Sequence, residues 1–234
     1  KLSYDIVVVG AGHAGAEAAS AAARLGSRTL LITIDMEKIA SMSCNPAVGG
    51  VAKGQIVREI DALGGQMARI TDQSAIQFRM LNRSKGAAMW SPRAQCDKSE
   101  FSRLWRRTLE NTKNLYLWQD SVTEILLDHT GEKVAVRGVK TRMGVEIECR
   151  RVVLTAGTFL GGLMHCGINS AEGGRAGDEA SHGITEQLVS LGFESGRMKT
   201  GTPARLDART INFDALEVQE GDIEPSKFSY DADT

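Results

Sequence analysis

Residues 4–15 read YDIVVVGAGHAG, and this stretch decides the fold of the chain. The apolar, β-branched run before Gly10 is typical of a buried parallel strand, and the alanine-rich residues 16–25 that follow favour a helix. In such a unit Gly10 permits the tight turn, Gly12 lets the backbone approach a phosphate group, and Gly15 lets the helix pack closely on the strand. The free N–H groups at the start of the helix complete a site for a diphosphate. The stretch therefore predicts a dinucleotide-binding turn.

The residues after this helix bear on which dinucleotide binds. Gly26 ends the helix, and residues 28–34 (RTLLITI) predict the second parallel strand. An acidic residue that holds the ribose hydroxyls is expected about 20 residues after the glycines, and Asp35 lies near that position. In flavoproteins the usual position is seven residues after the helix-ending glycine, which here is Thr33. Since residues i and i+2 of a strand share a face, both side chains are candidates for the ribose, and a plain NAD site stays open.

The composition is that of an ordinary globular chain. It has 234 residues and a formal net charge of −1, so any nucleic-acid site must be a local patch. No apolar run approaches the length of a membrane span. The four histidines and four cysteines show no metal-ligand or CxxC spacing, which argues against a metal site or disulfide framework and fits a reducing cytoplasm. The chain begins without Met and ends in an acidic stretch, so we expect a fragment.

The segment around Cys44 is the candidate reactive site. Residues 43–50 read SCNPAVGG, and a helix is predicted over 55–63. Cys44 thus precedes a helix start and lies near Lys53 in sequence, and both features lower thiol pKa values and favour a reactive thiolate. The alternative is a small buried cysteine that only packs. A disulfide-reductase pair is disfavoured because Gly49 stands five residues on.

Residues 75–107 form a basic segment with interleaved aromatic residues. Its cations are Arg79, Arg83, Lys85, Arg93, Lys98, Arg103, Arg106 and Arg107, and its aromatic residues are Phe78, Trp90, Phe101 and Trp105. Such a patch can bind the phosphates of a nucleic acid or of a cofactor, with the aromatic rings available for stacking. The alternative is a solvated helix face, because residues 99–110 have the periodicity of an amphipathic helix.

Short β-rich pieces between residues 115 and 153 predict an antiparallel meander inserted before the chain returns to the parallel sheet. The return is a buried strand that ends in Thr155, Ala156 and Gly157, similar to the second cofactor-proximal turn of two-dinucleotide-fold flavoproteins. Together with the glycine turn, this favours FAD over NAD. The fold class predicted is α/β: a Rossmann-like FAD-binding domain of the two-dinucleotide-fold flavoprotein type with an inserted small antiparallel β segment.

Two further glycine loops follow the predicted return strand. Residues 173–178 read GGRAGD, and Asp178 is predicted to cap a helix over 179–191 whose first turn contains Ser181, a possible donor to the cofactor. Residues 199–205 form a second loop with two cations. The alternative for both loops is ordinary turn chemistry.

Four regions are predicted along the chain. Residues 1–114 form the FAD-binding core with the basic segment, 115–150 the inserted meander and 151–203 the return to the FAD-binding domain. Residues 204–234 begin a second, truncated insertion domain, in which we read no chemistry from Ile211 onward.

Together these motifs resemble the MnmG family, also called GidA. The resemblance runs from Tyr4 to about Ile211 through the blocks VVVGAGHAGAEAA, SCNPAVGGVAKGQIVREIDALGG, QFRMLNRSKGAA, RAQCDK, VVLTAGTFL, GGRAGD and KTGTPARLDARTI. Family chains are much longer, so the resemblance implies the N-terminal part only. The residues that it implies for FAD binding are Gly10, Ala11, Gly12, His13, Ala14, Gly15, Val122, which would offer its backbone to the adenine, and Ser181.

The resemblance implies an FAD-dependent enzyme that builds carboxymethylaminomethyl groups on C5 of the wobble uridine (position 34) of tRNA. It implies NADH as reductant, methylene-tetrahydrofolate as one-carbon donor, and a homodimer that joins an MnmE-type GTPase in a heterotetramer. The family's cysteine falls on Cys44, which would add to C6 of the uridine and activate C5. The alternatives are a folate- and FAD-dependent tRNA uridine methyltransferase of the TrmFO type, a generic NADH:flavin oxidoreductase, and a flavin-stabilised scaffold that does no chemistry.

Overall fold

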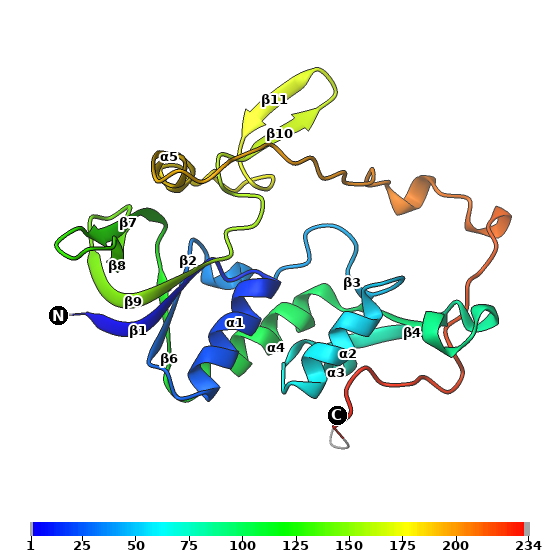
Figure 1. The fold of residues 1–234 in the computed structure, drawn as a ribbon. Coiled ribbons are helices and arrows are strands. Elements are labelled where there is room, and N and C mark those ends of the chain that lie inside the picture. Colours follow the sequence, from blue (N-terminus) through cyan, green and yellow to red (C-terminus); the bar gives the residue numbers. More distant parts are fainter. Residues whose placement is uncertain (1, 232–234) are drawn as a thin grey trace.

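A computed structural model describes residues 2–231 of the chain (Figure 1). Its main element is a six-stranded sheet with the strand order β6-β2-β1-β9-β8-β7. The strands are β1 (Ser3–Val9), β2 (Thr29–Thr33), β6 (Leu115–Gln119), β7 (Val122–Asp128), β8 (Ala135–Thr141) and β9 (Glu146–Leu154). The first four in this order are parallel, while β9-β8-β7 form an antiparallel meander. The carboxyl ends of the four parallel strands therefore meet at one edge.

The sheet curls back over one of its own faces. β6 and β7 stand at opposite ends of the strand order, yet only Asp120 and Ser121 separate them in sequence. Five strand spacings would put them about 24 Å apart in a flat sheet. Three peptide units reach at most about 11 Å, so the meander must fold over the parallel strands. The space between the two layers is filled by a core cluster that includes Val7, Ile32 and Ile147.

Four helices lie on the other side of the parallel strands: the first and the last of them pack on these strands, and the middle two lie farther out, against a second sheet (Figure 1). They are α1 (His13–Arg24), α2 (Gly54–Ala62), α3 (Met67–Ser74) and α4 (Lys98–Glu110). The larger core cluster lies here, and it buries the Phe101 and Trp105 side chains of α4 completely. The carboxylate of Glu17 on α1 accepts hydrogen bonds from the backbone N–H groups of Gln66 (2.8 Å) and Met67 (2.5 Å), so α1 caps the start of α3. Burial raises the pKa of Glu17 above its ordinary value.

A second, antiparallel sheet has the order β3-β5-β4. Its strands are β3 (Ala47–Gly49), β4 (Ala75–Leu81) and β5 (Ser91–Cys96). One face packs on the helices through Val48, Phe78 and Ala94, which belong to the larger core cluster. Because side chains alternate along a strand, the residues between them face the other way.

The rest of the chain is mostly irregular. A short hairpin of β10 (Leu163–Cys166) and β11 (Asn169–Glu172) precedes α5 (Ile184–Ser190). Residues 193–226 then cross the molecule above the carboxyl edge of the parallel strands as an extended, mostly exposed segment (Figure 1). We call this segment the arch.

The arch ends at a buried anchor. The Phe228 ring is fully buried, meets the Phe78 ring edge-on at 5.6 Å and lies against Gly49. Its backbone N–H donates to Asp72 on α3 at 2.8 Å. The chain is thus fastened to the helices and to the second sheet at the same point.

Two sequence expectations differ from this structure. Residues 115–119 form β6 at the edge of the parallel sheet, not a strand of the meander, because they pair with β2. The helix expected over 179–191 starts only at Ile184, with Gly183 at its N-cap; Asp178 does not cap it. The helix predicted over residues 55–63 is confirmed as α2, which begins at Gly54; the short strand β3 lies between Cys44 and this helix, so its N-terminus does not directly follow the thiol. The division into four regions stays a prediction.

Within residues 2–231, no helix is long and apolar enough to cross a membrane.

Candidate functional site

The glycine turn at the carboxyl end of β1 is shaped by close backbone contacts. Gly10 has φ +95°, and a Cβ at this position would lie 2.6 Å from the carbonyl oxygen of Thr155. A Cβ on Gly15 would lie 1.8 Å from the carbonyl oxygen of Gly10. Both distances are shorter than any real contact, so only glycine allows the helix and the two turns to approach this closely.

Gly12 differs from the other two glycines because the space beside it is open. It is the N-cap of α1, with φ −70° and ψ −172°, and no side chain caps the helix. A Cβ on Gly12 would meet no heavy atom within 4 Å. The N–H groups of the first helical turn, including those of His13 and Ala14, are therefore offered to an external acceptor. This cradle fits a diphosphate, which is what FAD would place there.

The second turn, at the end of β9, is locked onto the first. The Thr155 hydroxyl lies 2.8 Å from the carbonyl oxygen of Val9 and 2.9 Å from that of Gly10. The backbone N–H of Thr155 also donates to Val9 at 2.9 Å. Ala156 and Gly157, which has φ +59°, continue the turn beside the glycine cradle, so the predicted residues 155–157 lie together with residues 10–15.

Thr33 and Asp35 stand at the end of β2, as predicted, but both side chains already have local partners. The Thr33 hydroxyl donates to the Asp35 carbonyl at 3.4 Å and is almost buried. The Asp35 carboxylate accepts from the backbone N–H of Glu37 at 2.9 Å and pairs with Lys38 at 3.3 Å. A ribose hydroxyl would have to share the Asp35 carboxylate with these donors.

Val122 and Ser181 reach the same edge from the far side of the sheet. The backbone N–H of Asp120 donates to the Thr33 carbonyl at 2.9 Å, which holds the start of β7 beside the end of β2. A Cβ on Gly183 would lie 2.4 Å from the carbonyl oxygen of Thr123, so the chain just after Ser181 presses on the residue just after Val122. The curl of the sheet therefore gathers all the predicted cofactor residues along one edge.

Sequence reasoning missed Lys38 and its partner. Lys38 forms an ion pair with Asp178, 140 residues away, and Asp178 is also 3.6 Å from Arg175. Burial lowers the pKa of His13, and the nearby Arg175 guanidinium lowers it further. Two cations, Lys38 and Arg175, thus stand near the start of α1. The spacing of residues in the sequence does not predict this contact, because it forms only when the GGRAGD loop packs against the segment that contains Lys38.

Cys44 lies in an exposed loop. The Arg205 guanidinium, from the arch, donates to the carbonyl oxygen of Ser43 at 3.1 Å. The thiol is therefore exposed to solvent, and the arch contacts its loop directly.

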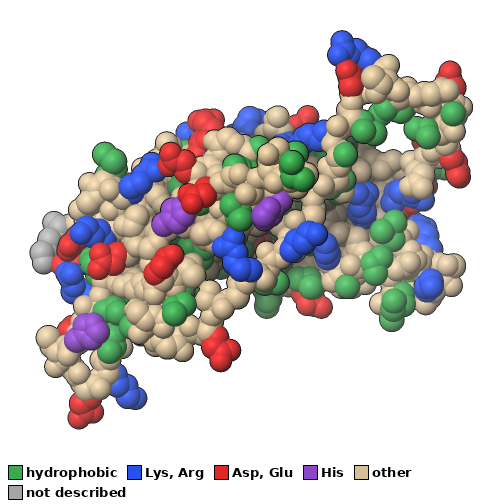
Figure 2. Space-filling model, turned by 90° about the horizontal axis from the view of Figure 1, so that it is seen from above, with side chains coloured by type: hydrophobic (Ala, Val, Ile, Leu, Met, Phe, Trp, Pro, Cys, Tyr) green, Lys and Arg blue, Asp and Glu red, His purple; other side chains and the backbone are tan. Residues whose placement is uncertain are grey.

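Three of the eight cations in the basic segment form ion pairs with carboxylates of the described residues. Arg103 pairs with Glu100, Arg106 with Glu37 and Glu110, and Arg83 with Asp222. The cations without a carboxylate partner among residues 2–231 are Arg79, Lys85, Arg93, Lys98 and Arg107. Seen from above, Lys and Arg side chains gather beside the arch at the right of the molecule (Figure 2). On α4, Arg103 and Arg106 are paired whereas Lys98 and Arg107 are not within the described part of the chain, so the solvated helix face of the alternative interpretation accounts for only part of the segment.

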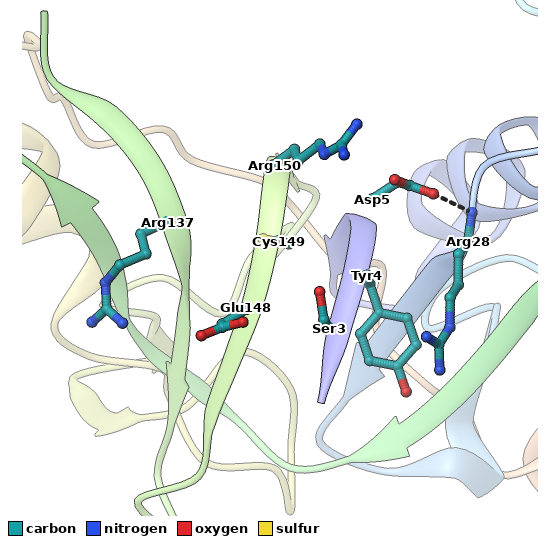
Figure 3. Close-up of a pocket in the computed structure, with 8 residues that line it drawn as sticks. All are labelled: Ser3, Tyr4, Asp5, Arg28, Arg137, Glu148, Cys149 and Arg150. Atoms are coloured by element: carbon teal, nitrogen blue, oxygen red, sulfur yellow. Dashed lines mark hydrogen bonds between the residues drawn. The ribbon is translucent and has the colours of Figure 1, made fainter. Parts of the chain in front are cut away.

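A hollow lies at the opposite, amino edge of the parallel sheet, and none of the predicted cofactor residues lines it (Figure 3). Arg28 lies over the Tyr4 ring at 4.9 Å, and its backbone N–H donates to Asp5 at 2.9 Å. Burial raises the pKa of Cys149, also in this hollow, to about 11, so its thiol is unreactive at neutral pH. In the described part of the chain, no cluster of three or more His, Cys, Asp or Glu side chains is arranged to hold a metal ion.

The family described as "Glucose inhibited division protein A" matches residues 5–234. The chain belongs to the GidA family. A GidA-family relative from Parabacteroides distasonis, "tRNA uridine 5-carboxymethylaminomethyl modification enzyme MnmG", is 62% identical over 229 residues, covering 98% of the chain and 36% of the relative. A relative of the same name from Porphyromonas gingivalis is also 62% identical. The chain thus spans about a third of the length of these relatives.

The GidA fold is also found by structural comparison. The solved GidA of Aquifex aeolicus has a TM-score of 0.93 and 49% sequence identity, covering 97% of this chain and 37% of that one. The GidA-related protein of Thermus thermophilus is more distant, with a TM-score of 0.58, 25% identity, and coverage of 82% and 69%. The predicted fold class is confirmed.

Proposed function

We propose that this chain is the FAD-binding N-terminal part of an enzyme that adds a carboxymethylaminomethyl or aminomethyl group to C5 of the wobble uridine of tRNA. The observation that carries the proposal is the open cradle at Gly12, framed by the close contacts of Gly10 and Gly15, in a chain 62% identical to enzymes with this printed activity. The printed name of the curated relatives and the likeness to the solved GidA structure support this activity rather than the methyltransferase alternative.

In this proposal the carboxyl edge of the parallel strands holds the cofactor. The N–H groups of residues 12–15 bind the diphosphate, Asp35 and Thr33 face the ribose, and the backbone of Val122 contacts the adenine. Ser181 and residues 155–157 complete the edge. When bound, FAD supplies the redox chemistry of the one-carbon transfer.

Cys44 is the proposed nucleophile. Its thiolate adds to C6 of the uridine, so that an S–C6 bond forms and the C5=C6 electron pair moves into an enolate that makes C5 nucleophilic. After C5 has bonded to the one-carbon unit, the C5 proton leaves and the S–C6 bond breaks, which restores the double bond and the thiol. The exposure of Cys44 supports this role, since a tRNA base must reach it.

The remaining parts of the reaction come from the family resemblance. NADH would be the reductant, methylene-tetrahydrofolate the carbon donor, and glycine or ammonium the amine source. We place the enzyme in the cytoplasm, as a homodimer that works with an MnmE-type GTPase.

The test is nucleoside mass spectrometry on tRNA from cells that lack the full-length protein, complemented with wild type or with Cys44→Ser. We expect carboxymethylaminomethyl-type uridines to vanish in the deletion, return with wild type, and stay absent with Cys44→Ser although FAD is bound. Loss of 5-methyluridine instead would assign the methyltransferase, and unchanged tRNA would reject both activities. Full rescue by Cys44→Ser would remove the nucleophile role alone.

A further inference from the structure

Two arginines of the second sheet stand directly opposite each other. Arg79 on β4 pairs with Arg93 on β5 in the antiparallel register, so their side chains leave the sheet side by side on the same face. Their neighbours Phe78 and Ala94 point into the core, which places both guanidinium groups on the outer face. Like charges in this position repel each other and destabilise a sheet.

No carboxylate of the described residues relieves this repulsion. Both arginines are half-buried, and neither forms an ion pair. Arg79 donates only to the neutral side-chain amide of Gln219, in the arch, at 3.0 Å. Arg93 has no partner on its other flank, because the residue opposite it on β3 is Gly49, which carries no side chain. The pair is therefore held in place but not neutralised.

An unpaired acceptor lies next to this pair. Gln95 follows Arg93 by two residues and so shares its face, and the side-chain oxygen of Gln95 is buried without any hydrogen-bond partner. Buried polar atoms without a partner are rare in folded proteins and call for an explanation. Gln95 pairs in register with Ala47, three residues after Cys44. The acceptor thus lies on β5, opposite the first residue of β3, the strand that follows the Cys44 loop.

We propose that Arg79 and Arg93 form a binding site for a phosphodiester group of the RNA strand whose uridine reaches Cys44. An anion between the two guanidinium groups would convert their repulsion into two charge-assisted contacts, and Gln95 would accept a hydrogen bond from the same nucleotide. This inference deepens the proposed function and rests on it.

Two observations favour RNA over a phosphate of the cofactor. The dinucleotide diphosphate already has a cradle at the start of α1, on a different sheet from the arginine pair. The face of the pair also opens toward the arch, beside which Lys and Arg side chains gather (Figure 2). The half-exposed Trp90, just before β5, offers a ring on which a flanking base can stack.

The test compares Arg93→Gln with the wild type in the full-length protein, using fluorescence anisotropy of labelled tRNA over a series of salt concentrations. We expect Arg93→Gln to weaken tRNA binding roughly tenfold or more at low salt. The slope of log K against log salt should also fall by about 0.7–0.9, the value for one lost phosphate contact. FAD affinity should stay unchanged, and the melting temperature should not drop, because the substitution removes a repulsion.

The matched control is Arg103→Gln, which removes the same charge from the same basic segment. Arg103 is exposed on α4 and paired with Glu100, so its loss should leave both tRNA affinity and the salt slope near wild type. If both substitutions change tRNA affinity and the salt slope equally, the effect comes from net charge alone, and the inference is overturned. Loss of FAD affinity in Arg93→Gln would assign the pair to the cofactor and overturn it too.

The inference and the proposed function can fail separately. If the wild type binds tRNA but Arg93→Gln leaves the slope of log K against log salt unchanged, the arginine site is rejected and the proposed function stands. Wild type with no tRNA affinity would reject both.

Discussion

Replacing Gly12 by alanine should separate folding from cofactor binding. The Gly12 backbone, at φ −70°, is one that alanine adopts freely, and the added methyl group meets no atom of the protein within 4 Å. Alanine restricts the unfolded chain, which stabilises by about 0.4–1 kcal/mol, but it is a poorer N-cap than glycine by a similar amount. The two effects nearly cancel, so we expect the free energy of unfolding to change by less than about 1 kcal/mol.

FAD binding should suffer much more. The methyl group would stand in the open space where the diphosphate must approach the N–H groups of α1. Losing one charge-assisted hydrogen bond costs about 1.5–3 kcal/mol, which corresponds to a roughly 10- to 150-fold increase in Kd. The assay is titration of the apoprotein with FAD, followed by flavin fluorescence, together with a thermal melt of each apoprotein.

Gly15→Ala serves as the contrasting variant. Its Cβ would lie 1.8 Å from the Gly10 carbonyl oxygen, so α1 must move away from β1, at a cost in the range of about 1–3 kcal/mol or more for overpacking. Stability should therefore fall here, whereas it is preserved in Gly12→Ala. If Gly12→Ala bound FAD within about twofold of wild type, the close approach of a diphosphate to this backbone would be refuted.

Three other predictions test the packing. Phe228→Ala should lower the free energy of unfolding by about 3–5 kcal/mol in chemical denaturation, whereas the same change at the exposed Phe213 should cost under about 0.5 kcal/mol; equal effects would show that the anchor does not hold the arch. Burial raises the pKa of Glu17 in the folded state above its unfolded value of 4.5. As pH rises from the unfolded pKa through the folded pKa, the carboxylate must ionise in a buried position, and the free energy of unfolding falls. Wild type should therefore gain stability relative to Glu17→Gln as pH falls from about 7 toward that value; a flat difference would contradict the shift. Iodoacetamide at pH 8 should label the exposed Cys44 and Cys166 rapidly in the native chain, as followed by peptide mass spectrometry. The buried Cys96 and Cys149 should be labelled only after unfolding.

Features that depend on the spacing of neighbouring residues were predictable from the sequence. The glycine turn, the strands that flank it and the amphipathic helix α4 all follow from neighbouring residues, because turn geometry and side-chain periodicity act over a few positions. The position of Thr155 beside Gly10 was also foreseeable, since a second strand with a similar end must join the same parallel edge.

Features that depend on distant contacts were not. The ion pair of Lys38 with Asp178 joins residues 140 positions apart, and nothing at either position distinguishes it from a solvated charge. The assignment of β6 to the parallel sheet depended on its partner β2, because its alternating pattern suits either kind of pairing. The Arg79–Arg93 pair required the register of β4 and β5, which a one-residue slip would have changed.

The pairing of β1 with β9 has a consequence for synthesis on the ribosome. Ser3 of β1 pairs with Glu148 of β9, 145 positions later by subtraction. At about 5–20 residues per second, roughly 7 to 30 seconds pass between the emergence of the two strands. Throughout that time the apolar strand β1 keeps one edge unpaired, which is a template for intermolecular pairing. The nascent chain should therefore be most dependent on chaperones before residue 154 has emerged, and far less so afterwards.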